Sequence, residues 1–197
     1  MLEFDAETHT YRFAGKIVPS VTGVLRAIDN FDHVPAELLE RARKFGQHVH
    51  AATDLFDRGI LDEEDLDPLL LPYLNAYKLF LSESGFVVEH SEEKVYSARH
   101  KYAGTLDKRG KWKKTSWLVD LKSGAVPRSV GPQTAGYQQA CAEPPRRRLC
   151  LQLKRNAYKL IACEDASDWH LFLSCLNINH FNARTINSGQ RLDEYAA

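Results

Sequence analysis

The stretch Trp117-Leu118-Val119-Asp120-Leu121-Lys122 decides the fold, because it is an apolar run that carries two charges two residues apart. Side chains alternate between the two faces of a β-strand, so Asp120 and Lys122 would point to the same face. A carboxylate and an ammonium group would then share one site.

A second apolar and aromatic run, from Val95 to Leu106, ends at Asp107. A connection rich in glycine and lysine separates the two runs, so they could pair as antiparallel strands and bring Asp107 beside Asp120. The sequence therefore predicts two carboxylates and a lysine close together.

This set of groups suits a divalent cation and a negatively charged substrate. Mg²⁺ prefers hard oxygen ligands and usually keeps open positions for water and phosphate oxygens. Such an ion can lower the pKa of a bound water and polarise the phosphorus, while a lysine can stabilise charge that grows on the phosphate. An isolated Asp-x-Lys is more often a strand end with surface charges, so the longer pattern has to decide.

Five short motifs, taken in chain order, resemble the PD-(D/E)xK nuclease superfamily, and within it the RecB-like and phage-exonuclease branch. They are Phe45-Gly46-Gln47-His48-Val49-His50, Glu92-Glu93-Lys94-Val95, Gly104-Thr105-Leu106-Asp107, Val119-Asp120-Leu121-Lys122-Ser123-Gly124 and Gln133-Thr134-Ala135-Gly136-Tyr137. One departure is Leu106, which stands where the superfamily has proline, although the RecB-like branch often lacks that proline. The resemblance implies an α/β (α+β) fold: a restriction-endonuclease-like core with a central mixed β-sheet flanked by helices, and an N-terminal helical elaboration.

The resemblance also implies roles for particular residues. The implied metal ligands are Asp107, Asp120, the main-chain carbonyl of Leu121 and His50, with Glu92 at the edge of the same site and Glu93 as the alternative to it. Lys122 would be the catalytic lysine. Gln133 and Tyr137 are four residues apart, hence on one face of a helix, where they could orient Lys122 or contact DNA. The glycine before His50 would let this helix approach another backbone closely.

The implied ion is Mg²⁺ or Mn²⁺, as one or two ions. The implied activity is that of a metal-dependent deoxyribonuclease, an exonuclease that hydrolyses phosphodiester bonds at the ends of linear duplex or single-stranded DNA in phage or bacterial recombination, replication or repair. A recombination protein could be a partner. An endonuclease of the restriction or junction-resolving type and a catalytically silent DNA-binding module remain the alternatives, and cleavage polarity and oligomeric state stay open.

The charge distribution bears on DNA binding. The net charge is zero, which counts mildly against a nucleic-acid binder. Basic residues nevertheless crowd the connection between the two carboxylate strands, although such a run is often just a solvated turn. The predicted DNA contacts are Lys108, Arg109, Trp112, Lys113, Ser123 and Gln133.

Composition sets broader limits. A length of 197 residues with 44% apolar and 26% charged residues predicts one soluble domain, 1–197. The acidic start and the lack of an apolar run near roughly 20 residues predict a cytoplasmic protein without a membrane span. The cysteines are spaced 9, 13 and 12 apart and none precedes Cys141, so we expect buried, reduced thiols and no iron–sulfur cluster.

The periodicity predicts a mainly helical part at 1–85, a β-rich catalytic core at 86–165, a closing helix at 166–187 and a frayed tail at 188–197. Within these parts, residues 2–13 should form a hairpin, and helices should end near Ile28, Gly59 and Gly85. Strands are expected at 86–90, 92–97, 102–107, 117–122, 149–153 and 158–162, with a helix from Pro132 to about Ala142.

Overall fold

A five-stranded sheet forms the centre of the computed structural model, which describes residues 1–6, 8–29 and 34–188, the last four of these by their backbone only. The strand order is β4-β5-β6-β7-β8, and every neighbouring pair is antiparallel except β6 and β7. The predicted mixed sheet is therefore confirmed. The strands are β4 (Val87–Ser97), β5 (Tyr102–Trp112), β6 (Thr115–Lys122), β7 (Arg147–Lys154) and β8 (Ala157–Ala162).

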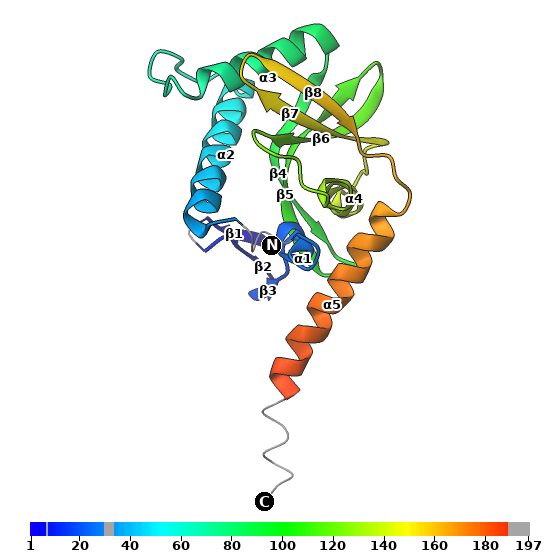
Figure 1. Ribbon diagram of the computed structural model, residues 1–197. Coiled ribbons are helices and arrows are strands. Elements are labelled where there is room, and N and C mark those ends of the chain that lie inside the picture. The colour runs from blue at the N-terminus through cyan, green and yellow to red at the C-terminus, as the bar shows by residue number, and fades with distance from the viewer. Residues whose placement is uncertain (7, 30–33, 189–197) are drawn as a thin grey trace, which may run out of the picture.

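Helices cover both faces of this sheet (Figure 1). Because β6 and β7 run parallel, the chain must cross over between them, and it does so through α4 (Val130–Ala140). One buried cluster joins the sheet to α4, to α1 (Val21–Leu25) and to α5 (Asp168–Ser188). A second joins it to α2 (Ala36–Asp57) and α3 (Leu71–Ser84). The helix-flanked sheet thus has an apolar layer on each side.

A small antiparallel sheet lies at the N-terminus, near the lower end of α2 in Figure 1. Its strands are β1 (Leu2–Asp5), β2 (Thr10–Phe13) and β3 (Lys16–Val18). The hairpin was predicted, whereas β3 was not, because three residues give no readable alternation. The Tyr11 hydroxyl lies 2.7 Å from Thr105 Oγ1, and the Phe13 ring stacks on Tyr96 with centroids 3.9 Å apart. These contacts fix the small sheet beside β4 and β5.

Several element boundaries differ from the predictions for local reasons. The strands expected at 86–90 and 92–97 form one strand, β4, with a register shift between Val88 and His90. The helix expected to end near Gly85 begins at Leu71, with a proline in its first turn, and the left-handed Gly85 caps its end as predicted. Of the tail expected to fray at 188–197, Ser188 is the last residue of α5, and 189–197 lie outside the described residues.

All four cysteines are buried and free, as expected. Within the described ranges, no helix combines the length and apolar content that crossing a bilayer would require.

Candidate metal centre

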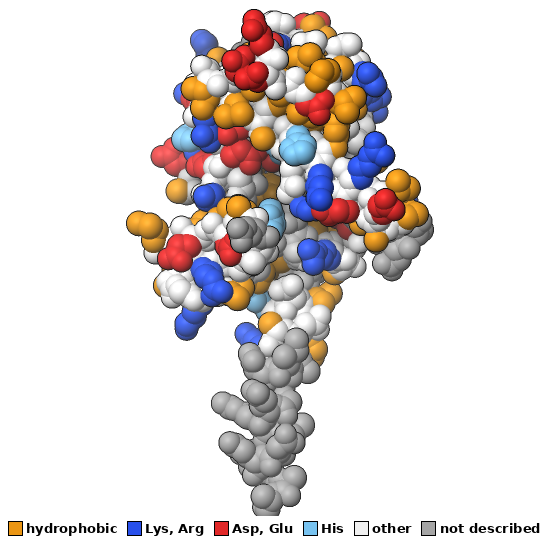
Figure 2. Space-filling view, turned by 90° about the vertical axis from the view of Figure 1, so that its left-hand side faces the viewer, with side chains coloured by type: hydrophobic (Ala, Val, Ile, Leu, Met, Phe, Trp, Pro, Cys, Tyr) orange, Lys and Arg blue, Asp and Glu red, His pale blue; other side chains and the backbone are white. Residues whose placement is uncertain are grey.

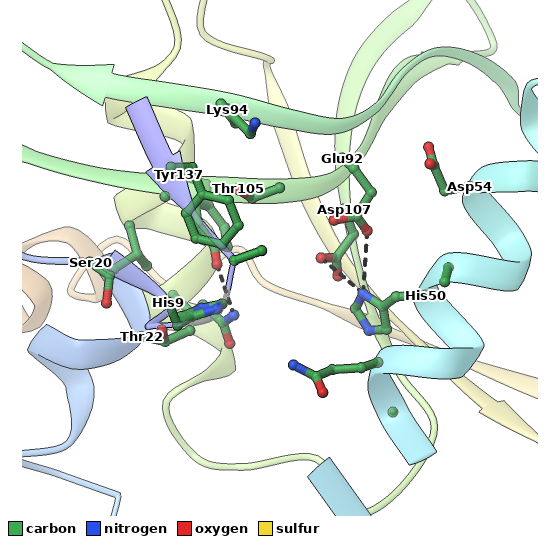
Figure 3. Close-up of a pocket in the computed structure, with 18 of the residues that line it drawn as sticks. His9, Ser20, Thr22, His50, Asp54, Glu92, Lys94, Thr105, Asp107 and Tyr137 are labelled. Carbon is green, nitrogen blue, oxygen red and sulfur yellow. Dashed lines mark hydrogen bonds and ion pairs between the residues drawn. The ribbon is translucent and has the colours of Figure 1, made fainter. Parts of the chain in front are cut away.

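Three side chains from separate elements converge on one point (Figure 3). His50 projects from α2, Glu92 from β4 and Asp107 from β5, and one ligand atom from each lies within 4.8 Å of the other two. His50 Nδ1 is 3.3 Å from Asp107 Oδ1 and 3.5 Å from Glu92 Oε1. The structure thus brings together three of the residues predicted as ligands.

Glu92 reaches this point through an unusual backbone. Its φ is 49°, in the left-handed region that non-glycine residues seldom occupy, although it lies inside strand β4. Its strand neighbour Glu93 points elsewhere and pairs with the Arg109 guanidinium at 2.8 and 3.0 Å. Of the two alternatives left open by the sequence, Glu92 therefore faces the site.

Strand β6 supplies the next layer. Its ladder with β5 ends at the pair Lys108 and Val119. Asp107, which precedes Lys108, and Asp120, which follows Val119, are the next residues of the two strands beyond that pair, as expected. The Leu121 N–H donates to Asp107 Oδ2 at 2.6 Å, and the Leu121 carbonyl oxygen is 3.2 Å from His50 Nε2. Both nitrogens of the imidazole therefore face oxygen atoms.

The pKa directions agree with this crowding of charge. Burial lowers the pKa of His50, but Asp107 and Glu92 outweigh it and raise the pKa from 6.5 to about 10. Burial would raise the pKa of Asp107, yet His50 and Lys122 hold it below its usual 3.8. In the metal-free protein, an imidazolium accordingly occupies the point where the ligand atoms meet.

Asp120 and Lys122 form a second pair beside this group. Lys122 Nζ lies 2.6 Å from Asp120 Oδ2 and donates to Gln133 Oε1 at 3.2 Å, while Gln133 Nε2 donates to the Tyr137 hydroxyl at 3.3 Å. Burial raises the pKa of Asp120 to about 6 against the opposing effect of Lys122. Burial also lowers the pKa of Lys122, but Asp120 and Asp107 raise it above its usual 10.5. Gln133 thus contacts Lys122 directly, and Tyr137 is linked to Lys122 only through Gln133.

The residues present fit a hard divalent cation. Asp120 Oδ1 and Glu92 Oε1 are buried without a hydrogen-bond partner among the described residues, a costly state for carboxylate oxygens unless a cation or water joins them. Asp107, Asp120, Glu92 and the Leu121 carbonyl would offer oxygen ligands and His50 a nitrogen, a set that suits Mg²⁺ or Mn²⁺.

A cleft of about 660 Å³ opens beside these groups. Its floor includes Asp107 and Lys122, and its walls are formed by α2 and by the β1–β2 hairpin, which contributes Phe4, His9 and Tyr11. The side of the molecule formed by α2 faces the viewer in Figure 2, where basic and acidic side chains are interspersed. The surface around the cleft on this face therefore carries both signs of charge. Besides Lys122, three cations line it: Arg43, Arg58 and Lys94, of which Arg43 is paired with Glu40 and Arg58 with Asp54.

Two of the predicted DNA contacts are wrong. Lys108 is fully buried, with its Nζ 2.6 Å from Asp57 Oδ2 and donating to Ser91 Oγ at 2.7 Å. The guanidinium of Arg109 is held in its bidentate pair with Glu93. Neither charge is available to a phosphate.

The other predicted contacts lie in two places. Gln133 lines the cleft, and Ser123 Oγ is 3.6 Å from where a Cβ on Gly46 would lie. That is an ordinary contact with a side chain, so the expected close approach of Gly46 to another backbone is wrong. Trp112 is the last residue of β5 and Lys113 lies in the turn after it, and neither lines the cleft.

A polar network that the sequence did not reveal joins α2 to the sheet beside the metal centre. Ser91 Oγ accepts from Lys108 and donates to Asp54 Oδ1 at 2.6 Å, and the Tyr77 hydroxyl donates to both oxygens of Asp57 at 2.9 Å. Asp54 follows His50 by one helical turn, and Ser91 precedes Glu92. In the sequence, the only sign of this network is the pair of carboxylates, Asp54 and Asp57, on the same predicted helix as His50. Their partners are distant in sequence, so the network could not be predicted.

Comparisons with known proteins add no evidence about the function of this site. No family model matches the chain, and no curated protein does. Among solved structures, the crystal structure of SSO0001 shows a likeness with 10% sequence identity, 68% of each chain covered and a TM-score of 0.35. A likeness at that level supports no inference about function.

Proposed function

We propose that this protein is a metal-dependent deoxyribonuclease that acts as an exonuclease on DNA ends, in phage or bacterial recombination, replication or repair. One observation carries the proposal: His50, Glu92 and Asp107 converge within 4.8 Å, beside a buried Asp120–Lys122 pair. Buried oxygens without partners, a cationic side chain and an adjoining cleft are what phosphodiester hydrolysis with Mg²⁺ or Mn²⁺ requires.

The ion, when bound, would supply Lewis-acid activation of water and of the phosphate. Asp107, Asp120 and the Leu121 carbonyl would hold it, with His50 and Glu92 completing the set. Lys122 has a raised pKa and is an ammonium group at neutral pH, so it would stabilise negative charge on the phosphate rather than take up a proton. Gln133 fixes the direction of its Nζ.

The cleft favours a terminus over the interior of a duplex. Its volume of about 660 Å³ is that of a small-molecule site, so it suits one strand better than two. Phe4 and His9 on the hairpin, with Lys94 Nζ 5.5 Å from the Phe4 ring centre, combine aromatic faces with positive charge, as in proteins that hold single strands.

A digestion assay tests the proposal with end-labelled linear DNA and covalently closed circles, each with Mg²⁺, Mn²⁺ or EDTA. Linear DNA should be degraded to short products only with metal, while closed circles persist. Rapid cutting of circles would instead identify an endonuclease, and binding without cleavage under every metal would identify a silent DNA-binding module.

Two variants tie the activity to this site. Asp120→Ala and Lys122→Ala should each lower the rate by about 10²–10³-fold, because each removes a group that stabilises the transition state. Lys154→Ala, on the exposed end of β7, is the matched control and should cleave at the wild-type rate. Near wild-type cleavage by Lys122→Ala would contradict its assigned role.

A further inference from the structure

A cationic surface lies at the end of the sheet where β5 turns into β6. Lys113 and Lys114 form this turn, and Arg146 is held beside it because its N–H donates to the Ser116 carbonyl oxygen and Oγ, both at 3.1 Å. These three side chains are exposed and form no ion pair with any residue that the structure describes. Arg147 follows on β7, paired in the ladder with Trp117, and its Nη1 lies 3.3 Å from Glu164 Oε1 in an ion pair whose two side chains are both more than half exposed.

Two indole rings position the cations of this surface. The rings of Trp112 and Trp117 lie 5.2 Å apart and pack at the edge of the apolar layer under α3. Lys113 Nζ lies 5.9 Å from the Trp112 ring centre, and the Arg147 guanidinium 5.4 Å from that of Trp117. Such contacts restrict the conformations of these long side chains, so the side chains lose less conformational entropy when they bind an anion.

The turn itself is unfavourable for the residues it contains. Lys113 has a φ of 49° and Lys114 a φ of 64°. A two-residue hairpin turn with both values positive strongly prefers Asn-Gly or Asp-Gly. Two lysines therefore occupy a conformation that costs energy, where common residues would fit without strain, and an observed outlier of this kind points to a function.

This surface is separate from the cleft. Five residues of β5 separate Trp112 from Asp107, or roughly 16 Å at the rise of an extended strand. About five nucleotides of a B-form strand span that distance at ~3.4 Å each. A DNA molecule with its end in the cleft could thus reach the surface with its flanking phosphates.

We propose that this surface, hereafter the tryptophan–lysine platform and made of Trp112, Lys113, Lys114, Trp117, Arg146 and Arg147, binds the phosphate backbone of DNA that flanks the cleft. The ligand is a polyanion because cations stand over the ring faces, which leaves the charges, rather than the rings, outermost. Contacts to phosphates alone read no sequence, which suits a nuclease that degrades DNA from its ends. The identity of the ligand rests on the proposed function, whereas the platform itself does not.

The test uses a variant that removes the charge and relaxes the turn. Lys113→Asn with Lys114→Gly should leave the melting temperature equal or higher, because Asn-Gly fits the turn. It should also lower the affinity for a fluorescent duplex of about 20 base pairs, measured by anisotropy in EDTA so that no cleavage occurs. The slope of log K against log salt should become less steep by about 1.8, at ~0.9 per lost phosphate contact.

A matched control removes the same charge elsewhere. Lys154→Gln with Lys159→Gln changes two exposed lysines, one at the opposite end of β7 and one on β8, and should leave the slope unchanged. The Asn-Gly variant should still cleave a fluorogenic oligonucleotide of about four nucleotides at the wild-type rate, since so short a substrate cannot reach the platform.

The outcomes separate the two proposals. An unchanged salt slope in the Asn-Gly variant overturns the platform, whether or not the protein cleaves DNA. Equal loss of slope in both double variants overturns it too, because the effect would then be general charge. A loss of slope confined to the Asn-Gly variant, in a protein that never cleaves DNA, supports the platform and refutes the nuclease. Binding of the platform to anionic lipid vesicles but not to the duplex would overturn its assignment to DNA.

Discussion

Replacing Lys108 by methionine should destabilise the protein strongly, although it leaves the candidate metal ligands untouched. The Lys108 side chain is 0% exposed and its Nζ is 2.6 Å from Asp57 Oδ2, a carboxylate that is itself 6% exposed. Methionine keeps most of the aliphatic volume, so the lost cation is the main change. Removing one partner of a buried ion pair costs about 3–5 kcal/mol. Because the Tyr77 hydroxyl still donates to Asp57, we expect the lower end, about 3 kcal/mol.

Urea unfolding of the metal-free protein measures this cost, and a thermal scan should show a fall of about 6–12 °C at ~2–4 °C per kcal/mol. Lys111→Met is the matched control on the same strand. Its ion pair with Glu89 is 2.9 Å long but the lysine is 60% exposed, so its loss should cost no more than about 1 kcal/mol. A cost below ~1 kcal/mol for Lys108→Met, equal to the control, would refute the reasoning, since Asp57 would then not depend on its cation.

Three further changes test the site and its scaffold. His50→Ala should weaken Mn²⁺ binding in titration calorimetry by at least ~10-fold, because even the loss of a hydrogen-bond partner of a metal ligand can have an effect of that size. The control His48→Ala changes an exposed histidine and should bind Mn²⁺ as the wild type does. Equal Mn²⁺ affinities of His50→Ala and wild type would remove His50 from the ligand set. Burial lowers the pKa of His50, but the neighbouring carboxylates outweigh it and raise the pKa to about 10. The charged imidazole therefore stabilises the metal-free fold fully below pH 6.5, and this contribution is lost as the pH rises toward 10. The unfolding free energy of wild type should therefore fall relative to that of His50→Gln across this window, and parallel curves would contradict the shift. Gly104→Ala should cost about 1–3 kcal/mol in urea unfolding, because its Cβ would lie 2.6 Å from the Tyr137 ring, whereas Gly124→Ala meets no atom within 4 Å and should cost less than 1.

The sequence predicted the parts of this site that depend on the geometry of single strands. A period of two is enough to place Asp120 and Lys122 on one face, and the ladder between β5 and β6 then brings Asp107 beside them. The order of the motifs also indicated His50, which α2 carries to the same point.

The sequence could not predict contacts that only the assembled layers create. Lys108 belongs to a basic run that reads as a solvated turn, yet it lies within the strand, and its partners Asp57 and Ser91 are 51 and 17 residues away. Nothing in the local pattern shows that α2 covers this part of β5. The φ of Glu92 is equally invisible, because a glutamate in an alternating strand gives no sign of a left-handed backbone.

The charges around the centre supply a reason for the proposed cation to bind there. Three carboxylates, those of Glu92, Asp107 and Asp120, face two cations, the imidazolium of His50 and the ammonium of Lys122. At neutral pH this leaves one negative charge in excess, together with the buried oxygens that lack partners. A divalent ion that displaces the His50 proton would bring the group to neutrality and give those oxygens a ligand. The left-handed conformation of Glu92 fits this proposal, because it brings the third carboxylate to a group whose excess negative charge a cation would balance.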